Sequence, residues 1–312
     1  MEMPFFTVLT CSYNRAKELS RLYQSLQRQT FRSFVWLVMD DSTTDGVGKS
    51  IREWQREGHI AIEYHRSEHR GKHWAQKEGF SLVRTPFVVD VDDDDELMDD
   101  CLSILHQAWC DIENEGRSDI GVVAGLTVDD RGCQICYDGW HGEYCDTDYI
   151  SMEWTRNHPS ENLLSRRSDV IVKANVYRDD GKWLYGQVSL VLESVLWNRV
   201  AERYKTRYVR KVLRKYHCEG TERLSLDRFD RQKCINYTFS NYVMLNELQG
   251  RYHENVKDTL KYLAEYLSCG LALTVSPQTL FYNLQSKWLR VAAFLLLPAA
   301  YCVGGYFRFR YF

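Results

Sequence analysis

Apolar positions in the first 125 residues alternate between short continuous runs and a three-to-four-residue spacing. The continuous runs have the length of buried strands; they are Phe5–Thr10, Phe34–Met39, Ile60–Tyr64, Phe87–Val91 and Ile120–Ala124. Helical spacing of apolar residues falls between them, over 19–26, 51–54, 75–82 and 97–112. Strands that alternate with helices in this way predict an α/β fold with a mixed, mostly parallel sheet and helices on both faces.

The rest of the chain is patterned differently. Polar, loop-like stretches cover 129–148 and 155–169, a helical pattern returns at Ser189–Tyr204, and residues from 235 onward are helical in character. We therefore expect three parts, which span 1–125, 126–230 and a helical C-terminal region at 231–312.

Composition narrows the class of protein. Apolar residues make up 44% and charged residues 27%, a balance that excludes a disordered chain. The net charge of −3 offers no electrostatic reason to expect a nucleic-acid partner. The N-terminus lacks the features of a secretory signal, so we expect a cytoplasmic protein with reduced cysteines.

One cysteine cluster has two interpretations. Cys133, Cys136, His141 and Cys145 come close to zinc-ligand spacing, although the last gap is short and no second half-site follows. The alternative is a β-hairpin around 130–132 that happens to carry thiols.

Polar residues follow three of the predicted strands. They occupy 10–15, 40–46 and 90–97, and the last segment contains five consecutive acidic side chains, Asp92–Glu96. Ligands bind at the carboxyl ends of the strands in such sheets. Carboxylates and hydroxyls there suit a nucleotide whose diphosphate is reached through a hard cation, Mg²⁺ or Mn²⁺. An EF-hand beginning at Asp90 is excluded, because its sixth and twelfth positions are Asp95 and Cys101 rather than Gly and Glu.

Taken in order, these segments resemble the inverting family 2 glycosyltransferases of the GT-A fold, of the bacterial polysaccharide type. The resemblance extends over about residues 4–225 and rests on five segments; they are Tyr13-Asn14-Arg15, Gln29-Thr30-Phe31, Asp40–Asp45, Gly71–Lys77 and the Asp92-x-Asp94-Asp95 frame.

The resemblance implies roles for particular residues. It places Thr10, Ser12 and Tyr13 in the nucleotide pocket, with Asp41 accepting from the base and Arg70 and Lys72 near the base or diphosphate. Asp92, Asp94 and Asp95 would hold the ribose and the metal, with Asp94 and Asp95 as the metal pair. The run of aspartates lets this frame slip by one residue, so the direct ligand stays open. Capping of the helix that follows is the structural alternative.

The same resemblance assigns the catalytic base. In the family an acidic residue opens a helix, with Trp four positions and Arg six positions later. Glu193 takes that position here, followed by Trp197 and Arg199. Leu192 departs from the pattern, since the family has Glu there. The alternative is a surface glutamate on an amphipathic helix.

The C-terminus carries an uncharged segment, Val291–Phe307, between basic and aromatic residues. As a helix it would be about 26 Å long, short of the roughly 30 Å hydrocarbon core, and Pro298 interrupts it. We expect it to lie at a membrane surface. A buried helix or a dimer contact is the alternative. A second basic stretch, 199–215, suits a solvated helix face or a surface for anionic lipid.

These observations predict an inverting, metal-dependent transferase. It would move a sugar from a nucleotide-diphosphate donor, with UDP favoured, to a hydroxyl of a glycan or lipid-linked acceptor in cell-surface polysaccharide synthesis. We expect it on the cytoplasmic face of the inner membrane as a peripheral protein. The alternatives are a catalytically silent sugar-nucleotide-binding or scaffold protein and a nucleotidyltransferase. The latter usually has a glycine-rich basic loop after its first strand, which is absent here.

Overall fold

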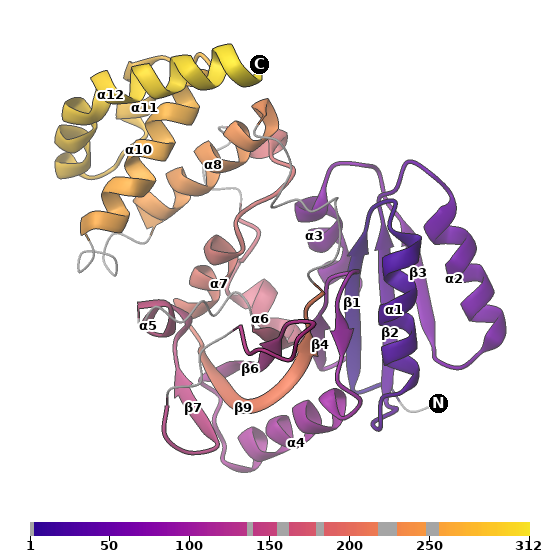
Figure 1. Cartoon of the computed structure of the whole chain (residues 1–312). Coiled ribbons are helices and arrows are strands. Elements are labelled where there is room, and N and C mark those ends of the chain that lie inside the picture. Colours follow the sequence, from indigo (N-terminus) through magenta and orange to yellow (C-terminus); the bar gives the residue numbers. More distant parts are fainter. Residues whose placement is uncertain (1–2, 136–139, 155–161, 179–183, 218–229, 248–255) are drawn as a thin grey trace. The chain divides into compact units, whose positions relative to one another are not determined.

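The computed structural model describes residues 3–135, 140–154, 162–178, 184–217, 230–247 and 256–312. These residues form two compact units (Figure 1). The first contains 1–177 and 199–220, and the second contains 178–198 and 221–312. The division is discontinuous in sequence, because the chain leaves the first unit and returns to it. The three-part division expected above stays a prediction.

The first unit is built on a nine-stranded mixed sheet with the order β3-β2-β1-β4-β8-β6-β9-β5, and β7 pairs with β9. Its strands are β1 (Phe6–Ser12), β2 (Phe34–Asp40), β3 (Ile62–Arg66), β4 (Phe87–Asp90), β5 (Glu96–Leu97), β6 (Ile120–Val128), β7 (Tyr144–Thr147), β8 (Leu163–Arg167) and β9 (Lys205–Lys215). Strands β1 to β4 are parallel, as predicted. The remainder is mixed, since β8 pairs antiparallel with both β4 and β6.

Among the described residues, six helices accompany this sheet, and the sequence of a seventh crosses the boundary between the two units. They are α1 (Ala16–Gln27), α2 (Gly46–Glu57), α3 (Lys72–Leu82), α4 (Cys101–Asn114), α5 (Tyr149–Trp154), α6 (Ser168–Lys173) and α7 (Glu193–Ala201), which begins in the second unit and ends in the first. The helix predicted from residue 97 begins four residues later, because Glu96 and Leu97 pair with β9 as a short strand.

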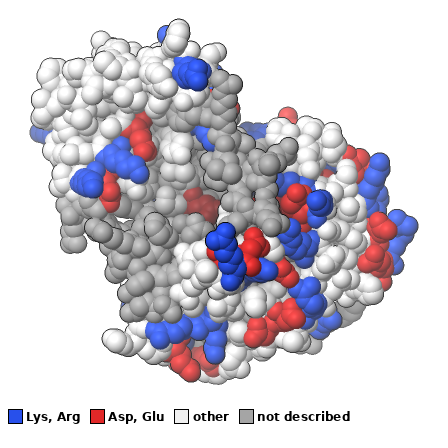
Figure 2. All heavy atoms as spheres, viewed as in Figure 1, with Lys and Arg blue, Asp and Glu red and all other residues white. Residues whose placement is uncertain are grey.

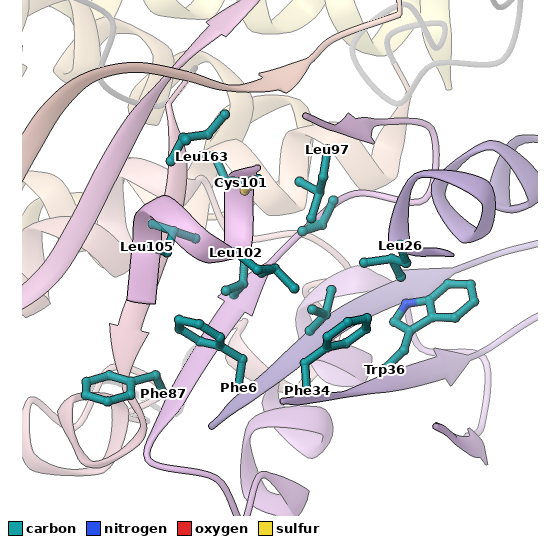
Figure 3. Packing of buried hydrophobic residues seen from close by; sticks show 14 of the residues in the cluster. Phe6, Leu26, Phe34, Trp36, Phe87, Leu97, Cys101, Leu102, Leu105 and Leu163 are labelled. Carbon is teal, nitrogen blue, oxygen red and sulfur yellow. The ribbon is translucent and has the colours of Figure 1, made fainter. Parts of the chain in front are cut away.

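The two faces of the parallel strands bury different side chains. Successive strand residues point to opposite faces, so Phe6 and Val8 join a core with α1, α2 and α4. Leu9 instead packs beneath α3 on the other face. Phe6, Phe34, Phe87, Trp36 and Leu102 lie together in Figure 3.

A glycine allows α3 to approach its face of the sheet. A Cβ atom at Gly79 would lie 2.6 Å from Leu9 Cδ1 and 2.9 Å from Met39 Cγ. Any larger residue there would require the side chains of Leu9 and Met39, or α3 itself, to shift. Since α3 begins beside the polar edge of the sheet, this contact also positions that edge.

The second half of the sheet departs from the sequence expectation. Two stretches interpreted as loops contain strands β7 and β8, and β8 lies in the middle of the sheet. The basic stretch that suggested a solvated helix face is largely strand β9. Its Arg207 is buried and bonds to Glu115 and Asp146. The pattern was misleading because ion pairs, which cannot be seen in sequence, make a buried arginine tolerable.

Cys136, one member of the cluster with near-zinc spacing, lies outside the described residues. The turn favoured instead is present, since Gly132 N–H donates to Asp129 O and Val128 pairs antiparallel with Gln134.

The second unit is helical where it is described. Its elements are a 3₁₀ turn η2 (Tyr185–Gln187), α8 (Arg231–Glu247), α10 (Val256–Ala272), α11 (Pro277–Tyr282) and α12 (Lys287–Tyr311). A core of leucines and Tyr266 joins α10, α11 and α12. The helical C-terminal region predicted from the sequence is therefore confirmed.

Candidate active site

The polar residues predicted to meet at one edge of the sheet do so. Strand β1 lies between β2 and β4, and all three are parallel. Their carboxyl ends therefore share one edge, where Ser12 aligns with Asp40 and Asp41 N–H donates to Ser12 O at 3.2 Å. Thr10 is fully buried just below this edge, and its hydroxyl accepts from Trp36 Nε1 at 3.1 Å.

The four consecutive aspartates alternate between burial and partial exposure. Asp93 and Asp95 are buried, whereas the side chains of Asp92 and Asp94 are 45% and 26% exposed. Asp92 and Asp94 are thus the members of the run that solvent and ligands can reach.

Each aspartate has a basic partner from a distant part of the chain. Lys72 Nζ lies 2.7 Å from Asp92, and Arg15 Nη1 lies 2.9 Å from Asp94 and 3.2 Å from Asp93. Asp95 Oδ2 accepts from an arginine of β9, with Arg214 Nη1 2.8 Å away. These cations offset the repulsion among adjacent carboxylates.

The two buried carboxyl groups are the hardest to ionise. Burial raises the pKa of Asp93 to about 7, against the opposing effects of the Ser12 hydroxyl, which donates to it at 2.7 Å, and of Arg15. Burial likewise raises the pKa of Asp95 to about 7, although Arg214 opposes it. Both groups are therefore partly protonated near neutral pH.

A second group of residues surrounds Asp41 on the same edge. Asp41 is buried, and its Oδ2 lies 3.1 Å from His69 Nδ1 and 3.3 Å from the backbone nitrogen of Gly71. The Tyr13 ring stacks on the His69 ring, with centroids 4.3 Å apart and planes 18° from parallel. Tyr13 is 42% exposed, so this aromatic surface is open to solvent at its rim.

The loop after β1 is held on the loop after β2 by Asn14. Its backbone has φ +57°, a left-handed conformation that asparagine tolerates better than most residues. Its N–H donates to Ser42 Oγ at 2.7 Å, and its side-chain carbonyl accepts from Thr44. This clamp positions Tyr13 next to Asp41.

The basic residues predicted here lie at the start of α3. Arg70 packs on the Trp74 ring, with its guanidinium carbon 3.9 Å from the ring centroid. Lys72 pairs with Asp92, as noted above. Arg70 is exposed, which leaves its guanidinium accessible to an anion.

Glu193, the predicted base, is the first residue of α7 and is partly buried. The segment before it is held on α8, since Ser189 N–H donates to Asn236 Oδ1 and Leu192 N–H donates to Ser240 Oγ. Trp197 and Arg199 are buried as structural members of the helix. Glu193 belongs to the second unit and the aspartates belong to the first. The surroundings of Glu193 and those of the aspartates are therefore described separately.

Four residues of this site were given no role by sequence reasoning. They are Arg15, His69, Asp93 and Arg214. Arg15 lies in a recognised motif and could have been suspected as a counter-charge. Arg214 is 119 positions from its partner Asp95, and no local signal could have found it.

The donor set suits a hard divalent cation that is completed by a ligand. Among the described residues, no three His, Cys, Asp or Glu side chains converge as a closed metal site. Mg²⁺ is commonly held by one or two carboxylates together with substrate phosphates. Asp94 is accessible, and Asp95 Oδ1 is buried without a hydrogen-bond partner in the described part of the chain, so both fit such a site.

The sheet, its flanking helices and the polar edge described above are those of an α/β domain with the GT-A fold. Residues 7–120 match the family model for glycosyl transferase family 2, so this part of the chain is similar to that family. The resemblance inferred from the motifs and the expected fold class are both confirmed.

A curated relative is the GalNAc(5)-diNAcBac-PP-undecaprenol beta-1,3-glucosyltransferase of Campylobacter jejuni. It is 28% identical over 119 residues, which cover 38% of this chain and 37% of the relative. The match thus spans little more than a third of that enzyme.

Two solved structures share the fold over nearly the whole chain. S. aureus TarS 1–349 in complex with UDP-GlcNAc has a TM-score of 0.61 at 15% identity, covering 98% of this chain and 92% of TarS 1–349. The mannosyltransferase PcManGT of Pyrobaculum calidifontis, in complex with GDP-Man and Mn²⁺, has a TM-score of 0.53 at 12% identity, covering 99% and 88%.

Proposed function

We propose that this protein is an inverting glycosyltransferase that moves a sugar from a nucleotide-diphosphate donor, UDP by preference, to a hydroxyl of a glycan or lipid-linked acceptor in cell-surface polysaccharide synthesis. One observation carries the proposal. The buried carboxylate of Asp41 and the partly exposed ring of Tyr13 adjoin the acidic run on one edge of one sheet. The glucosyltransferase activity in the name of the C. jejuni relative supports the reaction class, and the UDP-GlcNAc bound to TarS supports the donor type.

Donor recognition follows from the chemistry of these groups. An ionised carboxylate only accepts hydrogen bonds, so Asp41 would accept the imide N–H of a uracil ring. Tyr13 would stack on that ring. Thr10 and Ser12 support the pocket from β1, and Asp92 would bind the ribose hydroxyls. Arg70 and Lys72 supply positive charge for the diphosphate.

The metal would be held by Asp94 and Asp95, with Mn²⁺ or Mg²⁺ as the fitting ions. When bound, it would neutralise the negative charge that develops on the leaving diphosphate. Lys72 would act on the same charge, and Asp92 would keep the ribose fixed while the glycosidic bond breaks.

Glu193 would be the general base. It takes the proton of the acceptor hydroxyl as that oxygen bonds to the anomeric carbon, while the bond from the anomeric carbon to the diphosphate oxygen breaks on the opposite face. Attack opposite to the leaving group inverts the anomeric configuration. Leu192 before it favours the second candidate, a silent sugar-nucleotide-binding protein, which would not need Glu193.

The test is calorimetry and turnover on the full chain. Wild-type protein should bind UDP more tightly than GDP, and Asp41→Asn should weaken UDP binding because a carboxamide presents an N–H beside the base N–H. UDP-sugars should be hydrolysed or transferred with inversion. Binding without turnover for any acceptor would select the silent binder, and no nucleotide binding would reject both.

We further propose that α12 contacts the membrane as a peripheral helix on the cytoplasmic face of the inner membrane. Among the described residues, α12 is the helix long and apolar enough to span a bilayer, with a mean hydropathy of 1.5 over its best 18 residues. It carries no acidic residue, and its exposed apolar side chains extend from one end to the other; they are Trp288, Val291, Phe294, Leu295, Tyr301, Val303, Tyr306 and Phe309.

The packing of α12 argues for an in-plane helix. One stripe, with Leu289, Ala293, Ala300 and Gly304, is buried in the helical unit. At Gly304 the helices are so close that a Cβ would lie 2.7 Å from Ser268 O of α10. A helix held along its length by a soluble bundle has its remaining face free to lie on a surface.

Charge favours an anionic lipid surface as the partner. Four basic residues flank the apolar segment, two at each end; they are Lys287, Arg290, Arg308 and Arg310. Figure 2 shows the visible face of the helical unit as mostly uncharged, with a few basic and a few acidic side chains. One stripe of α12 is buried in the helical unit and the opposite face is open, so the proposed membrane contact would use the open face alone.

A further inference from the structure

The ring of His69 makes the two contacts that are proposed above for the nucleobase, namely stacking on Tyr13 and a hydrogen bond to Asp41. It stacks on Tyr13 at 4.3 Å between centroids, and its Nδ1 lies 3.1 Å from Asp41 Oδ2. Because a carboxylate can only accept, Nδ1 carries the proton and donates to Asp41. His69 therefore presents a flat ring and an N–H donor at this site.

A pyrimidine base would present the same pair of groups. Uracil has an aromatic face for Tyr13 and an imide N–H for Asp41. The imidazole and the base cannot take the same face of Tyr13 and the same oxygen of Asp41 together. On the proposed function, on which this inference rests, we propose that His69 occupies the nucleobase position in the unliganded enzyme and swings out when the donor binds.

The surroundings of His69 allow it to leave. Its side chain is 49% exposed, so a rotation carries the ring into solvent without disturbing the core. The segment that bears it is anchored on both sides, by Ser67 N–H donating to Asp40 O at 2.9 Å and by Gly71 N–H to Asp41. The displacement is therefore confined to a side chain and its immediate backbone.

Asp41 keeps a hydrogen-bond donor while His69 is replaced by the base. When His69 departs, the Gly71 N–H still donates to Asp41 Oδ2, so the buried carboxylate is never without a partner. Gly71 has φ +96°, which favours glycine and turns its N–H toward Asp41 at the start of α3. The imide N–H of the incoming base then replaces the Nδ1–H of His69 as the donor to Asp41.

This arrangement makes His69 a competitor of the donor. The apparent dissociation constant is the intrinsic one divided by the fraction of molecules with an open site. If the closed form predominates by about tenfold, His69→Ala should tighten nucleotide binding by about tenfold. The improvement should depend on the presence of the base, since His69 contacts Tyr13 and Asp41, the two residues proposed to bind it.

The experiment is calorimetry on the full chain with Mn²⁺ present. UDP and uridine should both bind His69→Ala about five- to tenfold more tightly than wild type, by the same open-fraction relation. Pyrophosphate, which has no base, should bind both proteins equally. His65→Ala is the matched control, because His65 is an exposed histidine of the neighbouring strand β3 and should change nothing.

The outcomes separate this inference from the function on which it rests. Suppose that wild type binds UDP and that Asp41→Asn lowers the affinity for UDP. If His69→Ala then lowers this affinity as well or leaves it unchanged, the nucleotide site is supported and the occupancy by His69 is refuted. If UDP binds none of the variants, the proposed function itself fails. A tighter complex for uridine but not for pyrophosphate would support the displacement.

Discussion

Replacing apolar residues on the open face of α12 should release the protein from lipid without unfolding it. Phe294 and Leu295 are 69% and 73% exposed, so little packing is lost when both become serine. Fully burying such a side chain is worth about 1.5–3 kcal/mol. Insertion of the exposed portions into an interface would contribute about 3 kcal/mol for the pair, which corresponds to about a hundredfold in partition coefficient.

The assay is co-sedimentation with vesicles that contain anionic lipid, together with thermal melting of the same proteins. The Phe294→Ser/Leu295→Ser protein should lose about two orders of magnitude in binding with a melting temperature close to wild type. Val172→Ser is the matched control, because Val172 is 79% exposed on α6 of the first unit. It should bind vesicles as wild type does.

Truncating the helix would not be informative, because its buried stripe belongs to the core of the helical unit. Gly304→Ala should instead lower the melting temperature, since the added Cβ would meet Ser268 O, and overpacking costs about 1–3 kcal/mol. Its vesicle binding should persist below the melting transition. Unchanged sedimentation of the Phe294→Ser/Leu295→Ser protein with vesicles would refute the membrane contact. An equal loss of vesicle binding in Val172→Ser would show that the assay measures non-specific adsorption.

Three further outcomes are expected. Glu193→Gln should keep the fold and nucleotide affinity while kcat falls by about two to four orders of magnitude, and wild-type turnover would place the base elsewhere. Activity should require Mn²⁺ or Mg²⁺ and vanish in Asp94→Ala and Asp95→Ala, so full activity in excess chelator would contradict the metal assignment. Burial lowers the pKa of His73 to about 3, and the unfolded chain, whose histidine has a pKa near 6.5, takes up a proton first as pH falls. Stability should therefore decline below about pH 6.5, by up to about 1.4 kcal/mol per pH unit, and urea unfolding of His73→Gln should show a smaller decline between pH 7 and 4.5.

The parallel half of the sheet could be predicted because its signals are local. Phe34–Met39 and Phe87–Val91 are continuous apolar runs, and a strand buried on both faces needs such a run. The mixed half was missed because its signals are not local. Leu163–Arg167 is short and ends in two arginines, yet it lies between β4 and β6. Arg166 is buried there beside Asp90, a pairing that spans 76 positions.

The candidate site shows the same division. Its carboxylates were predicted because they directly follow strands, and the position of a residue after a parallel strand determines the edge where it lies. Its cations were predicted in part: Arg70 and Lys72 lie in a recognised motif, whereas the pairing of Arg15 and Arg214 with the acidic run joins positions far apart in the sequence. His69 was missed because no motif or periodicity in the sequence marks a single histidine in a polar loop as a site residue.

The acidic run shows how local sequence and tertiary structure together create the site. Four adjacent carboxylates repel one another, and full ionisation would be costly at this spacing. The chain lowers that cost in two ways. Asp93 and Asp95 are buried, and their raised pKa values keep part of the population neutral near pH 7. Asp92 and Asp94 stay partly exposed and pair with Lys72 and Arg15.

This alternation also bears on the frame that the sequence left open. Residues 92–95 form a turn in which Asp95 N–H donates to Asp92 O at 3.3 Å, and this turn exposes Asp92 and Asp94 while Asp93 and Asp95 face inward. A slip of the frame by one residue would present Asp93, whose oxygens are already bonded to Ser12 and Arg15, to the ligand. In the proposed frame that begins at Asp92, Asp94 is the partly exposed member of the metal pair and Asp95 is its buried neighbour.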